Sequence, residues 1–445
     1  MTQATPAPIY KISLLTGIAI VVANMVGTGV FTSLGFQVVD IQGGFALLML
    51  WVVGGVIALC GALSYGELAA AMPRSGGEYH YLSRIYHPAV GFLSGWVSAT
   101  VGFAAPTALA AMALGRYAQS VWPGLSPLWL SVGVVLGLAV VHSTSRRAGS
   151  RLQLLVTSVK VLVLAGLIGV GLLVATPQPI SFVPHVVADW QQLVSPAFAV
   201  SLVYVSYAYS GWNAAVYLTG EVAEPQRNLP RILVLGTGLV LLVYVGLNFV
   251  FLYSTPLAKI SGQLEVGFVV ATALFGPVAG RVMGGAIAVL LVSTVSSMLF
   301  AGPRIVQVMG EDLPVLRPLA QLSPAGIPVR ATMFQTALTL LFVFTGTFEQ
   351  ILLYAGFVLS LFTFLTVLGL FVLRFRQPEL PRPYRTWGYP LTPLLFLLLN
   401  GWTLRFIAQS KPHETLYGLA TLAIGLLLYL AGQRLFRQPS PASRS

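Results

Sequence analysis

The residues best suited to chemistry are a Gly-Thr-Gly triplet at 27–29, in the middle of the apolar run 14–38. In hydrocarbon an unpaired backbone N–H or C=O group costs several kcal/mol, so a helix interrupted there needs a cavity, ion or ligand. The half starting near Gly29 would offer N–H donors to an anion, and the half ending near Met25 and Val26 would offer carbonyls to a cation. This polarity favours a zwitterion, although the glycines also suit a bend or close helix packing.

A second interruption is predicted in the apolar run 194–219, where Ser210 and Gly211 precede the polar Asn213. Five predicted spans begin with each interrupted run, which is typical of transporters built from two inverted repeats with binding at the midplane. Two corresponding interruptions are harder to explain by packing than one. We therefore predict a binding site for a small zwitterion where the two interrupted helices meet.

Lys160 is another candidate, because it lies about eight residues inside the apolar run 152–174 and so roughly 12 Å from the end of that helix. A lysine at this depth either extends back to the headgroups or faces the bundle interior as a fixed or titratable cation. Four of the five residues at 293–297 carry hydroxyls. These hydroxyls either bond their own backbone or coordinate an ion or an ammonium group.

The elements that position these residues are transmembrane helices. Of the 445 residues, 56% are hydrophobic and only 8% are charged, which excludes a soluble domain and indicates an all-α polytopic membrane protein. Apolar runs of about 20 residues predict twelve spans, at 14–38, 44–71, 89–119, 127–142, 152–174, 194–219, 231–254, 277–302, 327–345, 350–373, 389–408 and 415–436.

The lysines and arginines set the orientation. Most of the 24 fall on the side of the predicted bundle that holds both termini, so we expect both termini in the cytoplasm and a cell inner membrane location. A polybasic face towards anionic membrane lipid also explains the net charge of +12 without any nucleic-acid partner. Glu67 lies near the inner end of the second span, where pairing with a loop arginine is favoured over proton transfer.

Several classes of site are not indicated by the sequence. The single cysteine, Cys60, lies inside a predicted span, so we expect no disulfide-linked partner subunit and a monomer or homodimer. We find no His, Cys and Asp cluster at metal spacing, no glycine-rich phosphate loop and no nucleophile beside a base. The sequence therefore predicts no metal, no cofactor and no catalytic residue.

The sequence resembles the amino acid–polyamine–organocation superfamily and, within it, a bacterial member of the L-type amino-acid transporter branch. The motifs that carry the resemblance are Gly27-Thr28-Gly29-Val30-Phe31, Pro73-Arg74-Ser75-Gly76-Gly77-Glu78-Tyr79, Tyr207-Ala208-Tyr209-Ser210-Gly211-Trp212-Asn213 and Glu224-Pro225-Gln226-Arg227-Asn228-Leu229-Pro230-Arg231. The resemblance implies a leucine-transporter-like fold of ten core helices in a five-plus-five inverted repeat plus two peripheral helices. The implied divisions are a tail at 1–13, repeats at 14–193 and 194–374, peripheral helices at 375–436 and a tail at 437–445.

The resemblance also implies roles for residues at the two interruptions. The substrate carboxylate is expected at Thr28 and Gly29, with an aromatic cover from Tyr207 and a further contact from Tyr244. Its amino group is expected at carbonyls near Met25, Tyr207, Ala208 and Ser210. Lys160 is expected to replace a sodium ion, with the carbonyl of Gly27 and the hydroxyl of Ser296 or Ser297 as its partners.

These inferences together predict a sodium-independent secondary transporter that exchanges neutral L-amino acids by alternating access. Glu67 is the only interior acid that the sequence indicates, which argues against cationic cargo. The alternative is a proton-coupled amino-acid permease or exporter that uses a titratable Lys160. A channel would need a continuous polar pore and a sensor would need an output domain, so both are remote alternatives.

Overall fold

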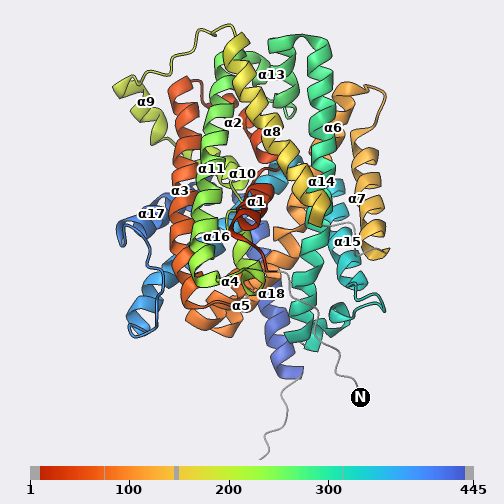
Figure 1. Cartoon of the computed structure of the whole chain (residues 1–445), viewed down its shortest axis with the longest axis vertical. Helices are drawn as coiled ribbons and strands as arrows, with labels where there is room; N and C mark the ends of the chain where they lie inside the picture. Colours follow the sequence, from red (N-terminus) through yellow and green to blue (C-terminus); the bar gives the residue numbers. More distant parts are fainter. Residues whose placement is uncertain (1–10, 75, 145–149, 313, 436–445) are drawn as a thin grey trace, which may run out of the picture.

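The computed structural model describes residues 11–74, 76–144, 150–312 and 314–435, and within them helices make up nearly all of the regular structure (Figure 1). Ser75 and most of the two predicted tails, 1–13 and 437–445, lie outside the described residues. The helices are α1 Leu14–Met25, α2 Gly29–Asp40, α3 Gly44–Ala71, α4 Gly77–Ile85, α5 Pro88–Val97, α6 Ala104–Val121, α7 Pro127–Thr144, α8 Ser150–Val174, α9 Val186–Leu193, α10 Pro196–Ala208, α11 Pro225–Ser254, α12 Leu257–Ile260, α13 Val266–Phe275, α14 Pro277–Asp312, α15 Val329–Thr345, α16 Phe348–Arg376, α17 Leu391–Ser410 and α18 Pro412–Leu435. Three further short turns of helix are η1 Ser98–Gly102, η2 Ala214–Glu221 and η3 Pro314–Ala320.

Nine of the spans in the described part of the chain are long and apolar enough to cross a membrane, counting α1 with α2 and α5 with α6. Four shorter apolar helices, including α10 and α13, accompany them. Large apolar side chains such as Leu162 and Leu173 point outward, as they do when lipid rather than water surrounds the bundle. The prediction of an all-α multi-pass membrane protein is confirmed.

Two helical runs are interrupted inside the bundle. α1 ends at Met25 and α2 begins at Gly29, while α10 ends at Ala208 and five residues of turn precede η2. Gly211 in this turn has a φ of +96°, a conformation that glycine adopts without steric cost. The predicted span 194–219 is therefore a shorter helix followed by a turn and a 3₁₀ segment.

The two interruptions are in close contact with each other. A Cβ atom added to Gly29 would lie 2.4 Å from the Cα atom of Ala208, and one added to Gly211 would lie 2.9 Å from the backbone of Asn24. Side chains at these two positions would therefore push the backbones apart. Figure 1 shows α1 near the middle of the bundle. α1 packs on α11, and α10 packs on α2, α3 and α16.

The third predicted span contains a distortion just before Pro106, where the sequence predicts a kink. Pro106 lies in the first turn of α6, and its missing N–H group leaves the preceding turn without a regular helical hydrogen bond. The distortion is the π-helical turn η1, which separates α5 from α6. This turn places Ser98 and Gly102 in the wall of the central cavity.

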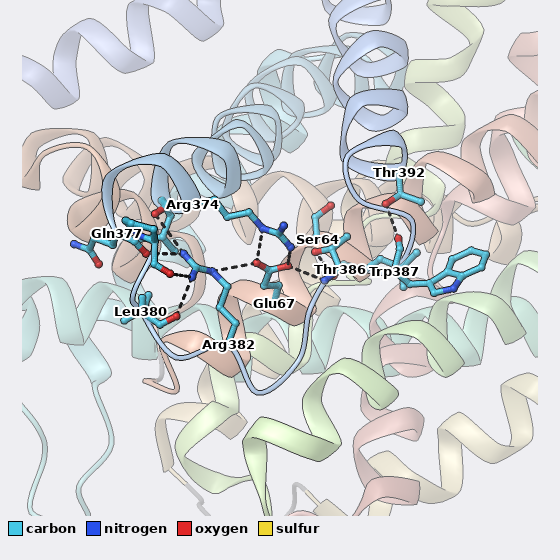
Figure 2. A network of polar contacts seen from close by, with 12 residues as sticks. Ser64, Glu67, Arg374, Gln377, Leu380, Arg382, Thr386, Trp387 and Thr392 are labelled. Atoms are coloured by element: carbon cyan, nitrogen blue, oxygen red, sulfur yellow. Dashed lines mark hydrogen bonds and ion pairs between the residues drawn. The ribbon is translucent and has the colours of Figure 1, made fainter.

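Glu67 at the end of α3 is the centre of a buried ionic network (Figure 2). Arg374 of α16 donates two hydrogen bonds to its carboxylate, at 2.8 and 2.6 Å. Arg382 lies 3.4 Å from it, and the backbone N–H of Thr386 donates a bond of 2.7 Å. The expectation of a structural ion pair is met, and the network fixes the α16–α17 loop against α3.

We expect the substitution Glu67→Gln to destabilise the fold by about 3 kcal/mol, because it leaves two partly buried guanidinium groups without their buried counter-charge. The measurement is thermal unfolding of the purified protein in detergent. Glu379→Gln is the control, because Glu379 is an exposed carboxylate on the same loop. Equal melting temperatures for the two variants would contradict a structural role for the network.

Candidate functional site

A cavity of about 670 Å³ lies where the two interruptions meet. Eight of the ten residues predicted to bind substrate line it: Met25, Gly27, Thr28, Gly29, Tyr207, Ala208, Ser210 and Gly211. Val26 and Tyr244 lie behind the wall instead. The structure thus brings the two predicted motifs together around one space, and the binding roles of these residues remain predictions.

Thr28 and Gly29 form the start of α2 at the cavity wall. The first N–H groups of a helix have no partner within it and carry partial positive charge, so this end suits a carboxylate. The hydroxyl of Tyr207 lies 3.4 Å from that of Thr28, and the Tyr207 side chain is buried. Tyr207 therefore bridges the two interrupted runs at the predicted carboxylate position.

Tyr244 of α11 has a different role from the predicted substrate contact. Its hydroxyl lies 2.6 Å from the carbonyl oxygen of Met25 and 3.1 Å from that of Ala208. These are the last carbonyls of α1 and α10, which lose their helical partners at the interruptions. A single phenol O–H group thus lies within hydrogen-bond distance of a carbonyl at each of the two helix ends. It occupies part of the acceptor capacity that is predicted to bind the substrate amino group.

Lys160 is buried, with 4% of its surface exposed, so it does not extend to the membrane surface. Its ammonium donates hydrogen bonds to Thr294 Oγ1 at 2.8 Å and to the carbonyl oxygen of Val26 at 3.4 Å. Lys160 thereby connects α8 to α14 and to the first interruption, immediately behind the cavity wall. The cation faces the bundle interior, as the second of the two predicted alternatives required.

The predicted partners of Lys160 were wrong. The carbonyl of Val26 takes the place of the Gly27 carbonyl, and Thr294 takes the place of the two serines. Ser296 instead bonds the ring of His142 at 2.8 Å, and Ser297 donates to the carbonyl of Ser293 at 2.8 Å. The reason differs for the two serines. Each residue turns a helix face by about 100°, so Ser296 points well away from Thr294, whereas Ser297 lies near the same face but about 4.5 Å farther along the helix.

The cavity is closed towards the end of the molecule where α13 lies, which is uppermost in Figure 1. Phe36 of α2 stacks on Tyr204 at 5.5 Å and on Phe348 at 6.0 Å, with the rings nearly parallel. The Tyr204 hydroxyl donates to Glu349 at 2.7 Å. Neither these four side chains nor any residue of α12 and α13 lines the cavity, so the cavity does not extend to the aromatic stack or to the α13 end.

Towards the opposite end, where α4 lies, the cavity wall continues to polar residues. They include Glu78 of α4, Glu221 of η2 and Arg304 of α14. The cavity therefore extends from the interruptions towards the α4 end, and the two sides of the site are not equivalent.

Glu78 is the residue that sequence reasoning missed. The sequence indicates it only as part of the motif at 73–79, yet its side chain is 5% exposed and lines the cavity. The inference that Glu67 is the only interior acid was therefore wrong. The available signal was the pair of glycines before it: Gly76 and Gly77 both have positive φ, +118° and +52°, and this turn brings α4 back under the bundle.

The part of the chain that the structure describes contains no group of three His, Cys, Asp or Glu side chains that could hold a metal ion. The polar groups of the cavity are backbone amides, hydroxyls, the amide side chains of three asparagines and a few charges. They can bind and orient a small polar molecule.

A membrane-spanning helical bundle with a cavity at two helix interruptions, closed on one side and extended on the other, defines a membrane transporter. The model of the amino acid permease family matches residues 12–429. The chain therefore belongs to the amino acid permease family, and the predictions of an amino-acid transporter rather than an enzyme are confirmed.

The relatives support the predicted branch. The chain is 29% identical to the large neutral amino acids transporter small subunit 2 of Mus musculus, over 95% of this chain and 81% of that protein. It is 27% identical to the b(0,+)-type amino acid transporter 1 of Mus musculus, over 94% and 87%. It is 28% identical to the Asc-type amino acid transporter 1 of Homo sapiens, over 95% and 82%. The resemblance to the L-type branch is confirmed, and the bacterial origin stays a prediction.

Proposed function

We propose that this protein is a sodium-independent exchanger of neutral L-amino acids that works by alternating access. The observation that carries the proposal is the meeting of the two interruptions at one cavity. There the start of α2 faces the same space as the ends of α1 and α10. Opposite partial charges in the wall of one small cavity suit the two charged ends of a free amino acid.

In this proposal the substrate carboxylate accepts hydrogen bonds from the start of α2, at Thr28 and Gly29. The ammonium takes the free lone pair of the Ala208 carbonyl at the end of α10, since a carbonyl oxygen can accept two bonds and Tyr244 uses one of them. The Met25 carbonyl at the end of α1 already accepts from Tyr244 and from the N–H group of Gly27, so it attracts the ammonium through its partial charge alone. Ser210 and Gly211 complete the wall. Tyr207 covers the substrate on the α13 side.

Lys160 supports the absence of a sodium requirement. Its ammonium is held by a carbonyl of the first interruption and a hydroxyl of α14, which are oxygen ligands of the kind that a hard cation uses. We propose that this permanent positive charge takes the place of a sodium ion and repels one. Ser296 and Ser297 lie on the same helix as Thr294, but the hydroxyl that accepts from Lys160 is that of Thr294.

The preference for neutral cargo no longer rests on an absence of interior acids. Glu78 and Glu221 line the cavity together with Arg304, so the wall carries both signs of charge. The proposal of neutral cargo instead draws on the relatives, one of which is named for large neutral amino acids.

For the arrangement in the membrane we propose twelve spans, with inverted repeats at 14–193 and 194–374 and peripheral helices at 375–436. α1–α2 and α10–η2 are the interrupted first and sixth spans of a leucine-transporter-like fold. Both termini and the α4 end face the cytoplasm from the cell inner membrane. Cys60 is buried within α3, which supports a monomer or homodimer without a disulfide-linked subunit, although one relative is named a small subunit.

The test is exchange by the purified protein in liposomes, loaded with one amino acid and supplied outside with another from a panel of the twenty. We expect uptake only when an amino acid is present inside, at the same rate with sodium or with choline as the external cation. Uptake into empty liposomes driven by a pH gradient would instead favour the proton-coupled permease or exporter. Uptake that requires sodium would refute the proposed role of Lys160.

A further inference from the structure

Glu78 joins three elements at the α4 end of the cavity. The hydroxyl of Tyr65 on α3 donates to Glu78 Oε1 at 2.7 Å, and the side-chain amide of Asn213 donates to the same oxygen at 2.9 Å. Asn213 follows the second interruption and lines the cavity. We call Tyr65, Glu78 and Asn213 the Glu78 junction. Through it, a buried carboxylate fixes the orientation of an amide that faces the cargo space.

The charge of Glu78 has no cationic partner in the described residues, because none of their ion pairs includes it. The titratable groups that face it are phenols: Tyr65 from α3, Tyr81 from α4 itself and Tyr217 from η2. α5 and α16 also pack on α4. A buried carboxylate that is held only by neutral donors sits close to the balance between its charged and protonated forms.

The packing around the junction shows that it closes against the second interruption. The ring of Tyr65 meets that of Trp212 edge-on at 4.6 Å, and a Cβ added to Gly77 would lie 2.7 Å from the ring of Tyr217. Tyr65 of α3 and Gly77 of α4 therefore lie against residues on the two sides of Asn213. Any movement of the second interruption away from α4 has to break the hydrogen bond from Asn213 to Glu78 Oε1.

We propose that Glu78 is a positioning residue for the cargo site: its carboxylate holds Asn213 in the cavity wall, and a proton bound at Glu78 strengthens the closed junction. This inference rests on the proposed transport function and adds a pH dependence to it. Glu78 itself lines the cavity, and in this proposal it acts on the cargo through Asn213.

Burial sets the direction of the pH effect. It raises the pKa of Glu78 to about 7 from an ordinary value of 4.5, against the hydrogen bonds from Tyr65 and Asn213 that lower it. A junction that opens exposes the carboxyl to water and returns its pKa towards that ordinary value. The closed junction therefore binds the proton more tightly than the open one, so acid favours the closed junction. This preference for the closed form is lost as the pH rises from about 4.5 to about 7.

The experiment measures the apparent KM for exchange in liposomes between pH 5.5 and 8.5, with radiolabelled L-leucine and L-alanine as a large and a small neutral probe. For the wild-type chain we expect the apparent KM to rise about tenfold with pH, with an inflection near 7 and little change in maximal rate. At every pH, Glu78→Gln should show the low apparent KM that the wild-type chain shows at acid pH. Glu311→Gln, which changes an exposed carboxylate on α14, should keep the wild-type profile.

Tyr65→Phe gives a second test that leaves Glu78 in place. It removes a donor that favours the charged carboxylate, so the inflection should move up by about one pH unit. Infrared difference spectra should show a protonated carboxyl band that titrates near pH 7 and is absent in Glu78→Gln. A pH profile unchanged by both substitutions, or the absence of such a band, would overturn the role of Glu78. Wild-type protein that exchanges nothing at any pH would overturn the proposed function and this inference with it.

Discussion

Replacing Lys160 by alanine is expected to reduce amino-acid exchange at least about 100-fold, with or without sodium. The ammonium of Lys160 is the donor that links the Val26 carbonyl to the hydroxyl of Thr294. Without it, a buried carbonyl at the first interruption loses its partner, and the cation that completes the end of α1 disappears. Hydrogen bonds to charged groups contribute about 1.5–3 kcal/mol each, and about 2.8 kcal/mol corresponds to two powers of ten in rate.

The measurement is exchange in liposomes, with the folded state of each variant checked by thermal unfolding. Lys259→Ala is the matched control, because Lys259 is an exposed lysine on α12. The exchange rate of Thr294→Ala should lie between those of Lys160→Ala and Lys259→Ala, since this substitution removes one acceptor of the Lys160 ammonium and keeps its charge. If the Lys160→Ala variant folds normally and exchanges at the wild-type rate without sodium, Lys160 does not hold the first interruption as we propose.

The positions of the two interruptions could be predicted from sequence, because glycine and polar residues at membrane depth are costly unless a site uses them. Gly27 and Gly29 on one side, and Ser210 and Gly211 on the other, line the same cavity in the structure. This part of the fold is encoded locally, within a few residues of each break. The chain pattern alone therefore identifies where the helices stop.

The partners of buried polar groups could not be predicted in the same way, because they depend on helix rotation. Lys160 was correctly placed inside the bundle, but its hydroxyl partner is Thr294 and not Ser296 or Ser297. All three lie in one short stretch of α14, and a difference of two residues turns the side chain by about 200°. The sequence restricts the hydroxyl partner of Lys160 to the cluster at 293–297. Which hydroxyl of that cluster bonds Lys160 is decided only by the packing of α8 on α14.

Glu78 and Tyr244 show a second limit. Tyr244 satisfies the carbonyls of Met25 and Ala208, which lie 219 and 36 residues away in the chain. Glu78 enters the cavity wall because two glycines with positive φ reverse the chain before α4. Contacts between such distant segments leave no periodic pattern in the sequence, so these roles follow only from the folded arrangement.

Replacing Gly29 by alanine is expected to reduce exchange about 100-fold while leaving the protein folded. Alanine is a better helix former than glycine, so α2 itself should not be weakened. The added Cβ, however, would lie 2.4 Å from Ala208 Cα and 2.6 Å from its Cβ, and ordinary contacts need about 1 Å more. The start of α2 must therefore move away from the end of α10, and a displacement of about 1 Å at a binding site can cost about 100-fold.

Exchange rates and melting temperatures of Gly29→Ala and Gly137→Ala separate this effect from a general intolerance of alanine. Gly137 lies inside α7 with nothing within 4 Å of an added Cβ, so its substitution should leave the rate unchanged. Adding Ala208→Gly to Gly29→Ala removes only the 2.6 Å contact and keeps the 2.4 Å contact with the backbone, so rescue should be partial at most. If Gly29→Ala exchanges at the wild-type rate, the two interruptions do not need to be in contact. The partially charged ends of α2 and α10 would then not bind one substrate together.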